Sequence, residues 1–242
     1  GNVSSQFITG LLFALPLLPE GGKIQITTPL ESKPYLDLTL KVLSTFGIEI
    51  QEQDNAYLVP GNQRYCSPGK QRAEGDWSNL AFWITANALG SSITYTGGDL
   101  HSAQGDKAIL SLLSSREIDG RQVPDLLPIL AAKAAVTPGT TRFIHAERLR
   151  LKESDRLRAI CQNINALGGC CRETTDGLIL EGRSLTGGTV EGYNDHRIVM
   201  AMAILATVCN DPVTIVGGEA VNKSYPDFFN DYRLLGGDVI EV

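Results

Sequence analysis

The sequence lacks the features that mark several large classes of protein. It has no run of eighteen apolar residues, so we expect no membrane-spanning helix and no membrane partner. No amino-terminal signal peptide is visible. Only five cysteines are present, and neither they nor the three histidines have the spacing of metal ligands. We therefore expect free thiols, a cytoplasmic location and no bound metal.

Positive charge is also scarce. Lys and Arg number 21 against 27 Asp and Glu, which gives a formal net charge of −6 at pH 7. This balance argues against a protein that holds nucleic acid by bulk charge, so no nucleic-acid partner is expected. It does not exclude a small anionic substrate, because a local group of Lys and Arg can dominate the field in a cleft.

What the chain does contain is one pattern repeated along its length. Each copy opens with a polar residue and an apolar run, followed by a β-branched stretch and a second amphipathic run. Three copies then close with a strand-like piece. The four copies start at Ser4, Asp76, Asp125 and Asp195. The second copy is shorter by about one strand hairpin, at the passage from Ser115 to Arg116.

The pattern within each copy predicts alternating helices and strands. Apolar residues at helical spacing predict helices over Leu110–Leu113 and Leu126–Ala135. β-Branched runs predict strands over Ile24–Thr27, Ile93–Thr96 and Val213–Val216. Repeated helix–strand–helix–strand units indicate a mixed α/β (α+β) fold.

The stretch Pro60–Gly75 is the best candidate for a linker. It is polar, contains several Pro and Gly residues and has no periodicity. A boundary in this stretch predicts two domains, 1–62 and 63–242. The first copy would lie on one side of the boundary and the other three copies beyond it.

Polar residues stand at the predicted helix starts of every copy. Ser, Asp and Asn are common there, since they accept from the N–H groups of the first turn. Lys and Arg are not, because their charge opposes the helix dipole. The cations that break this rule are Lys152, Arg156, Arg197 and Lys223. A bound anion would offset that cost, so we predict one polyanion-binding site built from several copies.

The densest group is the run from Lys152 to Arg156. These two cations are four residues apart, which would place them on one face of a helix. Glu153 lies beside them as a carboxylate able to transfer protons. A solvated, salt-bridged helix face is the alternative interpretation. His196, flanked by Asp and Arg, joins the candidate site, whereas the other two histidines are interpreted as structural.

Seven motifs along the chain resemble one family. SSQF, ESKPY, AQGD, PD, RLRLKESDR, YNDHR and NKSYPDF, in this order, resemble the EPSP synthase (3-phosphoshikimate 1-carboxyvinyltransferase) family. The resemblance implies the inside-out α/β barrel of enolpyruvyl transferases, with two similar domains of three βαβαββ units each and an active site between them. The family protein is nearly twice as long. Residues 1–62 would then be the last unit of the first domain, and 63–242 the second domain.

The resemblance also implies a reaction. The family transfers the enolpyruvyl group of phosphoenolpyruvate to the 5-hydroxyl of shikimate 3-phosphate and releases phosphate, in the biosynthesis of aromatic amino acids. The reaction passes through a tetrahedral intermediate and needs no metal or organic cofactor. Because the front half of the enzyme is absent, we expect weak or no turnover by this chain alone, with the missing amino-terminal half as a candidate partner.

By matching motif, the resemblance assigns roles to individual residues. Asp125 would accept the proton of the attacking hydroxyl, Glu153 would move a proton at the methylene carbon, and Lys152 would bridge the substrates. The residues expected to bind shikimate 3-phosphate are Ser4, Ser5, Gln6, Ser32 and Tyr35. The residues expected to hold phosphoenolpyruvate or support its pocket are Arg156, His196, Arg197 and Lys223.

Two other functions stay open. The enolpyruvyl transferase that acts on UDP-N-acetylglucosamine shares the fold and typically uses a loop cysteine, for which Cys66 is the candidate here. A non-catalytic domain that binds a phosphorylated ligand or a partner chain is the other alternative. Asp125 and Glu153 argue against it, since binding alone needs the cations but not two acid–base carboxylates.

Overall fold

The computed structural model describes all 242 residues, and the chain divides into two compact units. The first unit comprises Gly1–Glu74 with Asp99–Gly105, and the second comprises Gly75–Gly98 with Asp106–Val242. None of the helices has the length and hydrophobicity that a bilayer crossing requires.

The main division of the chain follows Glu74, inside the segment Pro60–Gly75 that the sequence marks as a linker. The short segment Asp99–Gly105 groups with the first unit, which the sequence pattern did not indicate. The assignment of 1–62 and 63–242 as separate domains stays a prediction.

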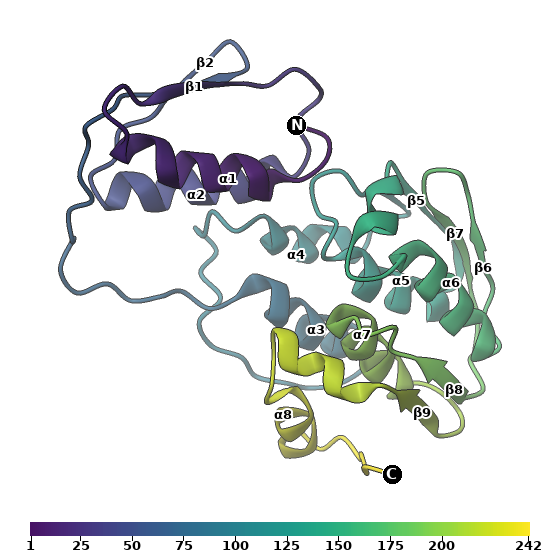
Figure 1. The fold of residues 1–242 in the computed structure, drawn as a ribbon. Coiled ribbons are helices and arrows are strands. Elements are labelled where there is room, and N and C mark those ends of the chain that lie inside the picture. The colour runs from purple at the N-terminus through teal and green to yellow at the C-terminus, as the bar shows by residue number, and fades with distance from the viewer. The chain divides into compact units, whose positions relative to one another are not determined.

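The first unit holds the first copy of the repeat. Its elements are α1 (Ser5–Ala14), the 3₁₀ helix η1 (Leu15–Leu17), β1 (Gly22–Gln25), α2 (Lys33–Thr45), β2 (Gln51–Gln53) and β3 (Ala56–Val59). β3 lies between β1 and β2 and is antiparallel to both. Helices α1 and α2 lie side by side on one face of this sheet (Figure 1). The core between the two layers is formed by Ile8, Leu12, Leu36, Leu43, Ile48, Tyr57 and Val59.

The second unit holds the other three copies, apart from Asp99–Gly105 of the second copy. Its helices are α3 (Trp77–Ala88), α4 (Ile109–Leu112), α5 (Leu127–Val136), α6 (Arg156–Ala166), α7 (His196–Ala206) and α8 (Phe228–Leu234). Its 3₁₀ helices are η3 (Glu147–Leu151) and η4 (Gly218–Lys223), and η2 (Gly105–Ala108) begins where the first unit ends. Its strands are β4 (Glu117–Asp119), β5 (Gly139–Ile144), β6 (Cys171–Glu173), β7 (Leu178–Gly182), β8 (Gly188–Glu191) and β9 (Val213–Val216).

The strands of the second unit form two sheets that display the repeat. One sheet has the order β4-β5-β7-β6, with β4 parallel to β5 and the other neighbours antiparallel. The other sheet pairs β8 and β9 in parallel. The order β5-β7-β6 matches β1-β3-β2 of the first copy, and the crossover β4-α5-β5 matches β8-α7-β9. The repeated mixed α/β fold is therefore confirmed, although none of the three sheets closes into a barrel.

Most predicted elements are present. β9 coincides with Val213–Val216, and α5 is shifted by one residue from Leu126–Ala135. β1 and α4 overlap the predicted Ile24–Thr27 and Leu110–Leu113. These stretches are those in which periodicity and β-branched content point to the same element.

The strand predicted over Ile93–Thr96 is wrong, and the closing piece Gly237–Val242 forms no strand either. The side-chain amide of Asn87 forms hydrogen bonds with both the backbone N–H and the backbone C=O of Ile93. Ile93 N–H donates to its Oδ1 at 2.7 Å, and its Nδ2 donates to Ile93 C=O at 2.8 Å. A strand needs a neighbouring strand for these groups, and the short second copy offers none, so the stretch stays irregular.

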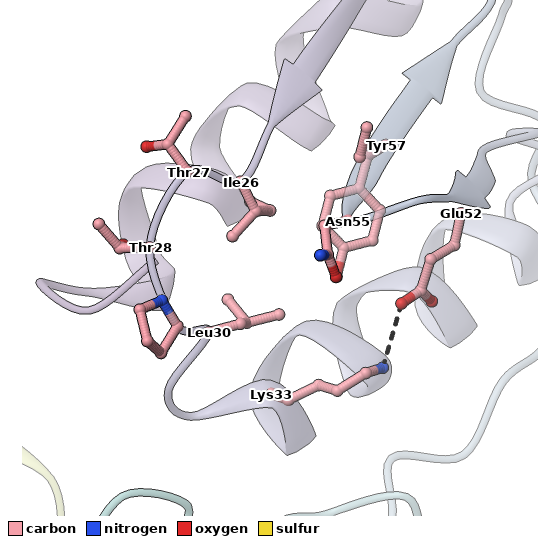
Figure 2. A pocket seen from close by; sticks show the side chains of 10 residues that line it. Ile26, Thr27, Thr28, Leu30, Lys33, Glu52, Asn55 and Tyr57 are labelled. Atoms are coloured by element: carbon pink, nitrogen blue, oxygen red, sulfur yellow. Dashed lines mark ion pairs between the residues drawn. The ribbon is translucent and has the colours of Figure 1, made fainter.

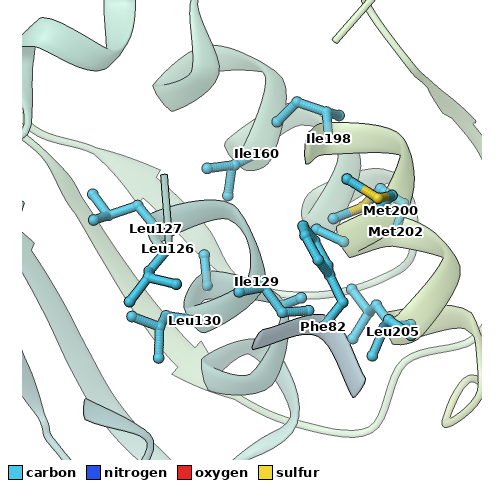
Figure 3. Close-up of a cluster of buried hydrophobic side chains, with 14 of the residues drawn as sticks. Phe82, Leu126, Leu127, Ile129, Leu130, Ile160, Ile198, Met200, Met202 and Leu205 are labelled. Carbon is cyan, nitrogen blue, oxygen red and sulfur yellow. The ribbon is translucent and has the colours of Figure 1, made fainter. Parts of the chain in front are cut away.

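Helices α3, α5 and α7 form the apolar centre of the second unit. α5 packs on both other helices, and α7 is buried along its length from His196 to Leu205. Figure 3 shows Phe82 of α3 among the side chains of these helices, beside Ile129 of α5 and Leu205 of α7. Burial of α7 on several sides fixes the position of its first turn, where charged residues lie.

The polar residues that open the copies mostly cap helices. Ser4, Asp76 and Asp195 accept backbone N–H groups at the starts of α1, α3 and α7, as does Asp155 at the start of α6. Asp125 differs, because it stands one position before the cap of α5. Its carboxylate is therefore not used as a helix cap and can contact other side chains.

Candidate functional site

Arg156 lies at the centre of a group of charged side chains in the second unit. Its side chain is 1% exposed. Nε donates to Asp195 at 2.8 Å, Nη1 to Asp125 at 2.8 Å and Nη2 to Glu153 at 2.7 Å. Together with two further cations these side chains form the group that we call the Arg156 cluster: Asp125, Lys152, Glu153, Arg156, Asp195 and Arg197.

Asp195 is the buried anchor of the cluster. Its side chain is fully buried, and it caps α7 by accepting the N–H of Arg197 at 3.0 Å. Ser154 Oγ also donates to it at 3.0 Å. Burial alone would raise the pKa of the Asp195 carboxyl, but the charge and hydrogen bonds of Arg156 outweigh burial and hold that pKa below its usual value. Asp195 is therefore ionised at neutral pH.

Asp125 lies among three cations. Arg156 donates to it at 2.8 Å, Arg197 lies 3.3 Å away and Lys152 lies 3.6 Å away. Burial opposes its ionisation, but the charges of Arg197, Lys152 and Arg156 hold the pKa of the Asp125 carboxyl well below its ordinary value. A carboxylate this acidic is a weak base at neutral pH. An anion that draws Arg197 and Lys152 away from it would raise its pKa and make it a better base.

Arg197 joins three segments at the start of α7. Its Nη2 donates to Ser78 Oγ at 2.7 Å, and its Nη1 donates to the backbone C=O of Asp125 at 3.4 Å. Ser78 belongs to the first turn of α3, which Asp76 caps. The guanidinium is mostly buried but keeps some exposed surface. It is therefore held in one orientation and can still be reached by a small anion.

His196 and Lys223 both adjoin the loop that precedes α7. The His196 side chain is buried, its Nδ1 has no hydrogen-bond partner, and burial followed by the charge of Arg197 lowers its pKa. Lys223 Nζ donates to the backbone C=O of Asn194. Tyr193 and Asn194 both have positive φ angles, so this loop is held in a tight turn. No group of three or more His, Cys, Asp or Glu side chains is arranged to hold a metal ion.

Two features of the predicted arrangement are wrong. Lys152 and Arg156 do not share a helix face, because Asp155 caps α6 and the helix begins only at Arg156. Lys152 instead follows η3 as its carboxyl-terminal cap, and the two cations converge on Asp125 from different segments. Lys223 is not at a helix start but in the last turn of η4, where a cation suits the dipole. Arg156 and Arg197 do occupy first turns.

The five remaining candidates lie at two adjacent helix starts in the first unit. Thr9 Oγ1 and Thr39 Oγ1 are 3.3 Å apart, one turn after Ser5 and Tyr35 respectively. Glu31 N–H also donates to Gly1 C=O at 3.2 Å, just before the two helices begin, so the starts of α1 and α2 are at the same end of the helix pair. Ser5 and Ser32 are buried, whereas Gln6 is exposed. The candidates at these two starts are Ser4, Ser5, Gln6, Ser32 and Tyr35.

The sequence did not single out three residues that the structure places in or beside the cluster. In the sequence Asp195 stands out only as the start of the fourth copy, yet its side chain also binds Arg156. Ser154 and Ser78 orient Asp195 and Arg197. The position of Asp195 within the YNDHR motif was an available signal, as was that of Ser154 within KESDR. Nothing in the local sequence indicates that Ser78 contacts a residue so distant in the chain.

Comparison with known proteins identifies a family. The model of the EPSP synthase (3-phosphoshikimate 1-carboxyvinyltransferase) family matches residues 1–118 and 111–232. The 3-phosphoshikimate 1-carboxyvinyltransferase of Clostridium acetobutylicum is 46% identical over 262 positions, which cover 100% of this chain and 61% of the relative. That of Clostridium novyi is 45% identical over 264 positions and is covered to 60%. The chain thus spans about three fifths of the length of these relatives.

Solved structures show the same fold. An EPSP synthase from Acinetobacter baumannii superposes with a TM-score of 0.81 at 22% identity, covering 96% of this chain and 60% of that one. The enolpyruvyl transferase NikO from Streptomyces tendae gives a TM-score of 0.61 at 18% identity, covering 90% of this chain and 56% of that one. At such identities the likeness concerns the fold alone.

The alignments also bear on the short second copy. The match to the Clostridium acetobutylicum relative runs over 262 positions although this chain has 242 residues, so at least 20 positions have no counterpart here. The two segments matched by the family model meet around residues 111–118. This is the passage at which the sequence pattern lacks a strand hairpin.

Proposed function

This chain belongs to the EPSP synthase family, and we propose that it forms part of an enzyme that transfers the enolpyruvyl group of phosphoenolpyruvate to the 5-hydroxyl of shikimate 3-phosphate. The observation that carries the proposal is the setting of Asp125. Three cations surround this carboxylate, and Arg156 links it to a second carboxylate, Glu153. An acid–base pair held among cations suits a reaction between two anions.

The proposed chemistry is an addition followed by an elimination. In the addition, the substrate hydroxyl attacks C2 of phosphoenolpyruvate, Asp125 accepts the hydroxyl proton and Glu153 delivers a proton to the methylene carbon. In the elimination, the methyl carbon loses a proton to Glu153, the C–O bond to phosphate breaks and phosphate departs. Glu153 is 40% exposed, so a substrate carbon can approach it. Lys152 and Arg197 would stabilise the added negative charge.

In this proposal Arg156 is not a cation that waits unpaired for phosphoenolpyruvate, because carboxylates of the chain already occupy it. All three of its side-chain nitrogens donate to carboxylates, and its surface is almost entirely covered. A substrate carboxylate can bind it only by replacing Glu153 or Asp125. We propose that Asp195 holds Arg156 throughout, while the bonds to Glu153 and Asp125 exchange with substrate. Lys223 and His196 would border the phosphoenolpyruvate pocket.

Shikimate 3-phosphate would bind at the first unit. Ser4, Ser5 and Gln6 lie at the start of α1, and Ser32 and Tyr35 lie at the start of α2, so both helix starts carry hydroxyl side chains. Helix starts with such groups suit a phosphate ester. The chain and its partners would act in the cytoplasm, where its five cysteines remain thiols.

Calorimetric titration of the purified chain with shikimate 3-phosphate, with and without phosphoenolpyruvate, tests the substrate assignment. We expect binding of shikimate 3-phosphate, and no heat from UDP-N-acetylglucosamine, the substrate of the sister enzyme. Cys66 is exposed, so labelling it is a second check, since a catalytic cysteine would lose reactivity when substrate is bound. A folded chain that gives no heat with shikimate 3-phosphate would contradict the assignment of the first-unit residues.

Phosphate-release assays test the catalytic part. We expect little turnover by the chain alone, and activity when it is combined with the remaining two fifths of a Clostridium relative. An Asp125→Asn variant in the same mixture should lose activity by about a hundredfold or more. Binding without any restored turnover would instead favour a non-catalytic domain that binds phosphorylated ligands.

A further inference from the structure

The first unit contains a cavity that the proposed reaction does not use. It lies between the end of β1, the β2–β3 hairpin and the start of α2, and its volume is about 350 Å³. Pockets of this size hold small molecules. Figure 2 shows apolar side chains, Ile26 and Leu30, on one side and polar side chains, Lys33, Glu52 and Tyr57, on the other.

Tyr57 gives the clearest sign of a ligand. Its side chain is 1% exposed, and its hydroxyl has no hydrogen-bond partner within the folded chain. Figure 2 shows its ring extending from β3 toward Leu30 and Lys33, into the cavity that they line. Burial, with the nearby charge of Glu52, raises the pKa of the phenol, so the hydroxyl keeps its proton and remains a donor. A ligand acceptor would remove the cost of this buried, unpaired group.

The internal repeat indicates that the fold does not require a tyrosine at this place. In the first copy Tyr57 faces Glu52 across the β2–β3 ladder. In the third copy Leu178 faces Glu173 across the matching β6–β7 ladder. Leu178 is fully buried and has no polar side-chain atom. The hydroxyl of Tyr57 is therefore an addition to the common fold rather than a part of it.

The comparison of the first copy with the third also explains why the first copy has a cavity beside Tyr57. In the third copy the connection from β5 to α6 includes η3, whose Leu149 is fully buried in the core. In the first copy the connection from β1 to α2 is shorter and contains no helix. The space beside Tyr57 is thus left by the first copy's own short connection.

The charges at the cavity limit the class of ligand. Lys33 contacts Asp37 and lies 3.5 Å from Glu52. Two carboxylates around one ammonium group disfavour a doubly charged anion such as a phosphate ester. Lys33 and Tyr57 supply donors and Glu52 an acceptor, so a fitting ligand carries an acceptor and a donor close together.

We propose that this cavity binds a small apolar α-amino acid. Its carboxylate would accept from Lys33 and Tyr57, and its ammonium group would donate to Glu52. Its side chain would pack on Ile26 and Leu30. The ligand would separate Lys33 from Glu52, which costs little because these side chains are 42% and 49% exposed and exposed ion pairs are weak. None of its residues belongs to the Arg156 cluster, and the proposal does not depend on the proposed reaction.

Titration of the ¹⁵N-labelled full chain with L-leucine, followed by amide chemical shifts, tests the proposal. We expect saturable shifts at 26–30 and 55–57. The matched probes are 3-methylbutylamine, which lacks the carboxylate, and 4-methylpentanoic acid, which lacks the ammonium group. Each should bind at least about tenfold more weakly than leucine. No shifts with leucine up to its solubility limit, or equal affinity for the acid alone, would overturn the proposal.

Two variants separate a binding role from a structural one. Tyr57→Phe removes only the hydroxyl, so we expect about tenfold weaker leucine binding together with an unchanged or higher melting temperature. Glu52→Gln should weaken leucine binding similarly, whereas Glu49→Gln, an exposed position outside the cavity, should not. A lower melting temperature with unchanged leucine affinity in Tyr57→Phe would show that the hydroxyl serves the fold and would refute the proposal.

Discussion

Arg156 and Asp195 form a buried ion pair in which Nε donates to Oδ2 at 2.8 Å and Nη2 lies 3.3 Å from Oδ1. The two residues come from the first turn of α6 and the cap of α7. Nη1 of Arg156 donates to Asp125 and Nη2 donates to Glu153, so this pair orients the guanidinium that contacts both proposed acid–base carboxylates. Within the Arg156 cluster, the fully buried Asp195 therefore holds the guanidinium of Arg156 in place.

Replacing Asp195 by Asn should destabilise the chain by about 3 kcal/mol, since Asn can still cap α7 but leaves the charge of Arg156 partly unpaired in a buried place. Urea unfolding measures this loss. Asp238→Asn, at an exposed position near the carboxyl terminus, is the matched control and should change stability little. An equally small effect at Asp195 would mean that Arg156 does not depend on this carboxylate.

The stability of the chain should fall as the pH decreases from 7 toward 5. His196 has an ordinary pKa of 6.5 in the unfolded chain, and burial followed by Arg197 lowers it in the folded chain. Near and below pH 6.5 the unfolded state therefore binds this proton more readily than the folded state does. Asp125 and Asp195 have lowered pKa values, so their contribution is lost only below their unfolded value of 3.8.

Unfolding curves of variants across this pH range assign the effect to one residue. His196→Asn should flatten the dependence between pH 5 and 7, whatever its effect on absolute stability. His101→Asn, at an exposed histidine, should retain the slope of the parent chain. An unchanged slope in His196→Asn would show that His196 titrates alike in both states.

Arg197→Gln should weaken the binding of phosphoenolpyruvate, in the presence of shikimate 3-phosphate, by about tenfold or more, because it removes a pre-oriented cation that Ser78 and Asp125 hold. Calorimetry measures the change. Arg183→Gln removes a half-exposed cation that pairs only with Glu181 and should leave the affinity unchanged. Equal affinities in the two variants would remove Arg197 from the proposed site.

Inserting the corresponding segment of the Clostridium acetobutylicum relative between Ser115 and Arg116 should raise the melting temperature. The second copy has only the four-residue α4, and a cavity of about 170 Å³ lies beside Leu113, Arg116 and Leu130. A hairpin there could fill this cavity and cover the partly exposed side chain of Leu113. A Gly/Ser segment of equal length is the control and should lower the melting temperature slightly, since it adds loop entropy alone.

The sequence predicted the helices best where apolar spacing and capping residues agree. The starts of α3 and α7 follow from Asp76 and Asp195, whose side chains accept N–H groups of the first turn. The error at Lys152 has a local cause as well. Asp155 is itself a cap, so the helix begins after it and the preceding residues belong to a loop. In the charged stretch from Lys152 to Arg156, the local sequence did not reveal at which polar residue the loop would end and the helix begin.

Strand prediction failed where the partner was missing. Ile93–Thr96 has strand-like composition, but whether it pairs depends on residues elsewhere in the chain. Asn87 satisfies the backbone of Ile93 instead. In the third copy, by contrast, β7 lies between β5 and β6 and all three stretches become strands.

By itself the sequence determined the repeat, the mixed α/β class and the presence of Lys, Arg and carboxylate residues near helix starts, because these follow from local spacing and composition. Only the tertiary structure decided that Arg156 is enclosed by Asp125, Glu153 and Asp195. Those partners arrive from segments far apart in the chain. Their contacts depend on how α5, α6 and α7 pack, and no local pattern encodes that packing.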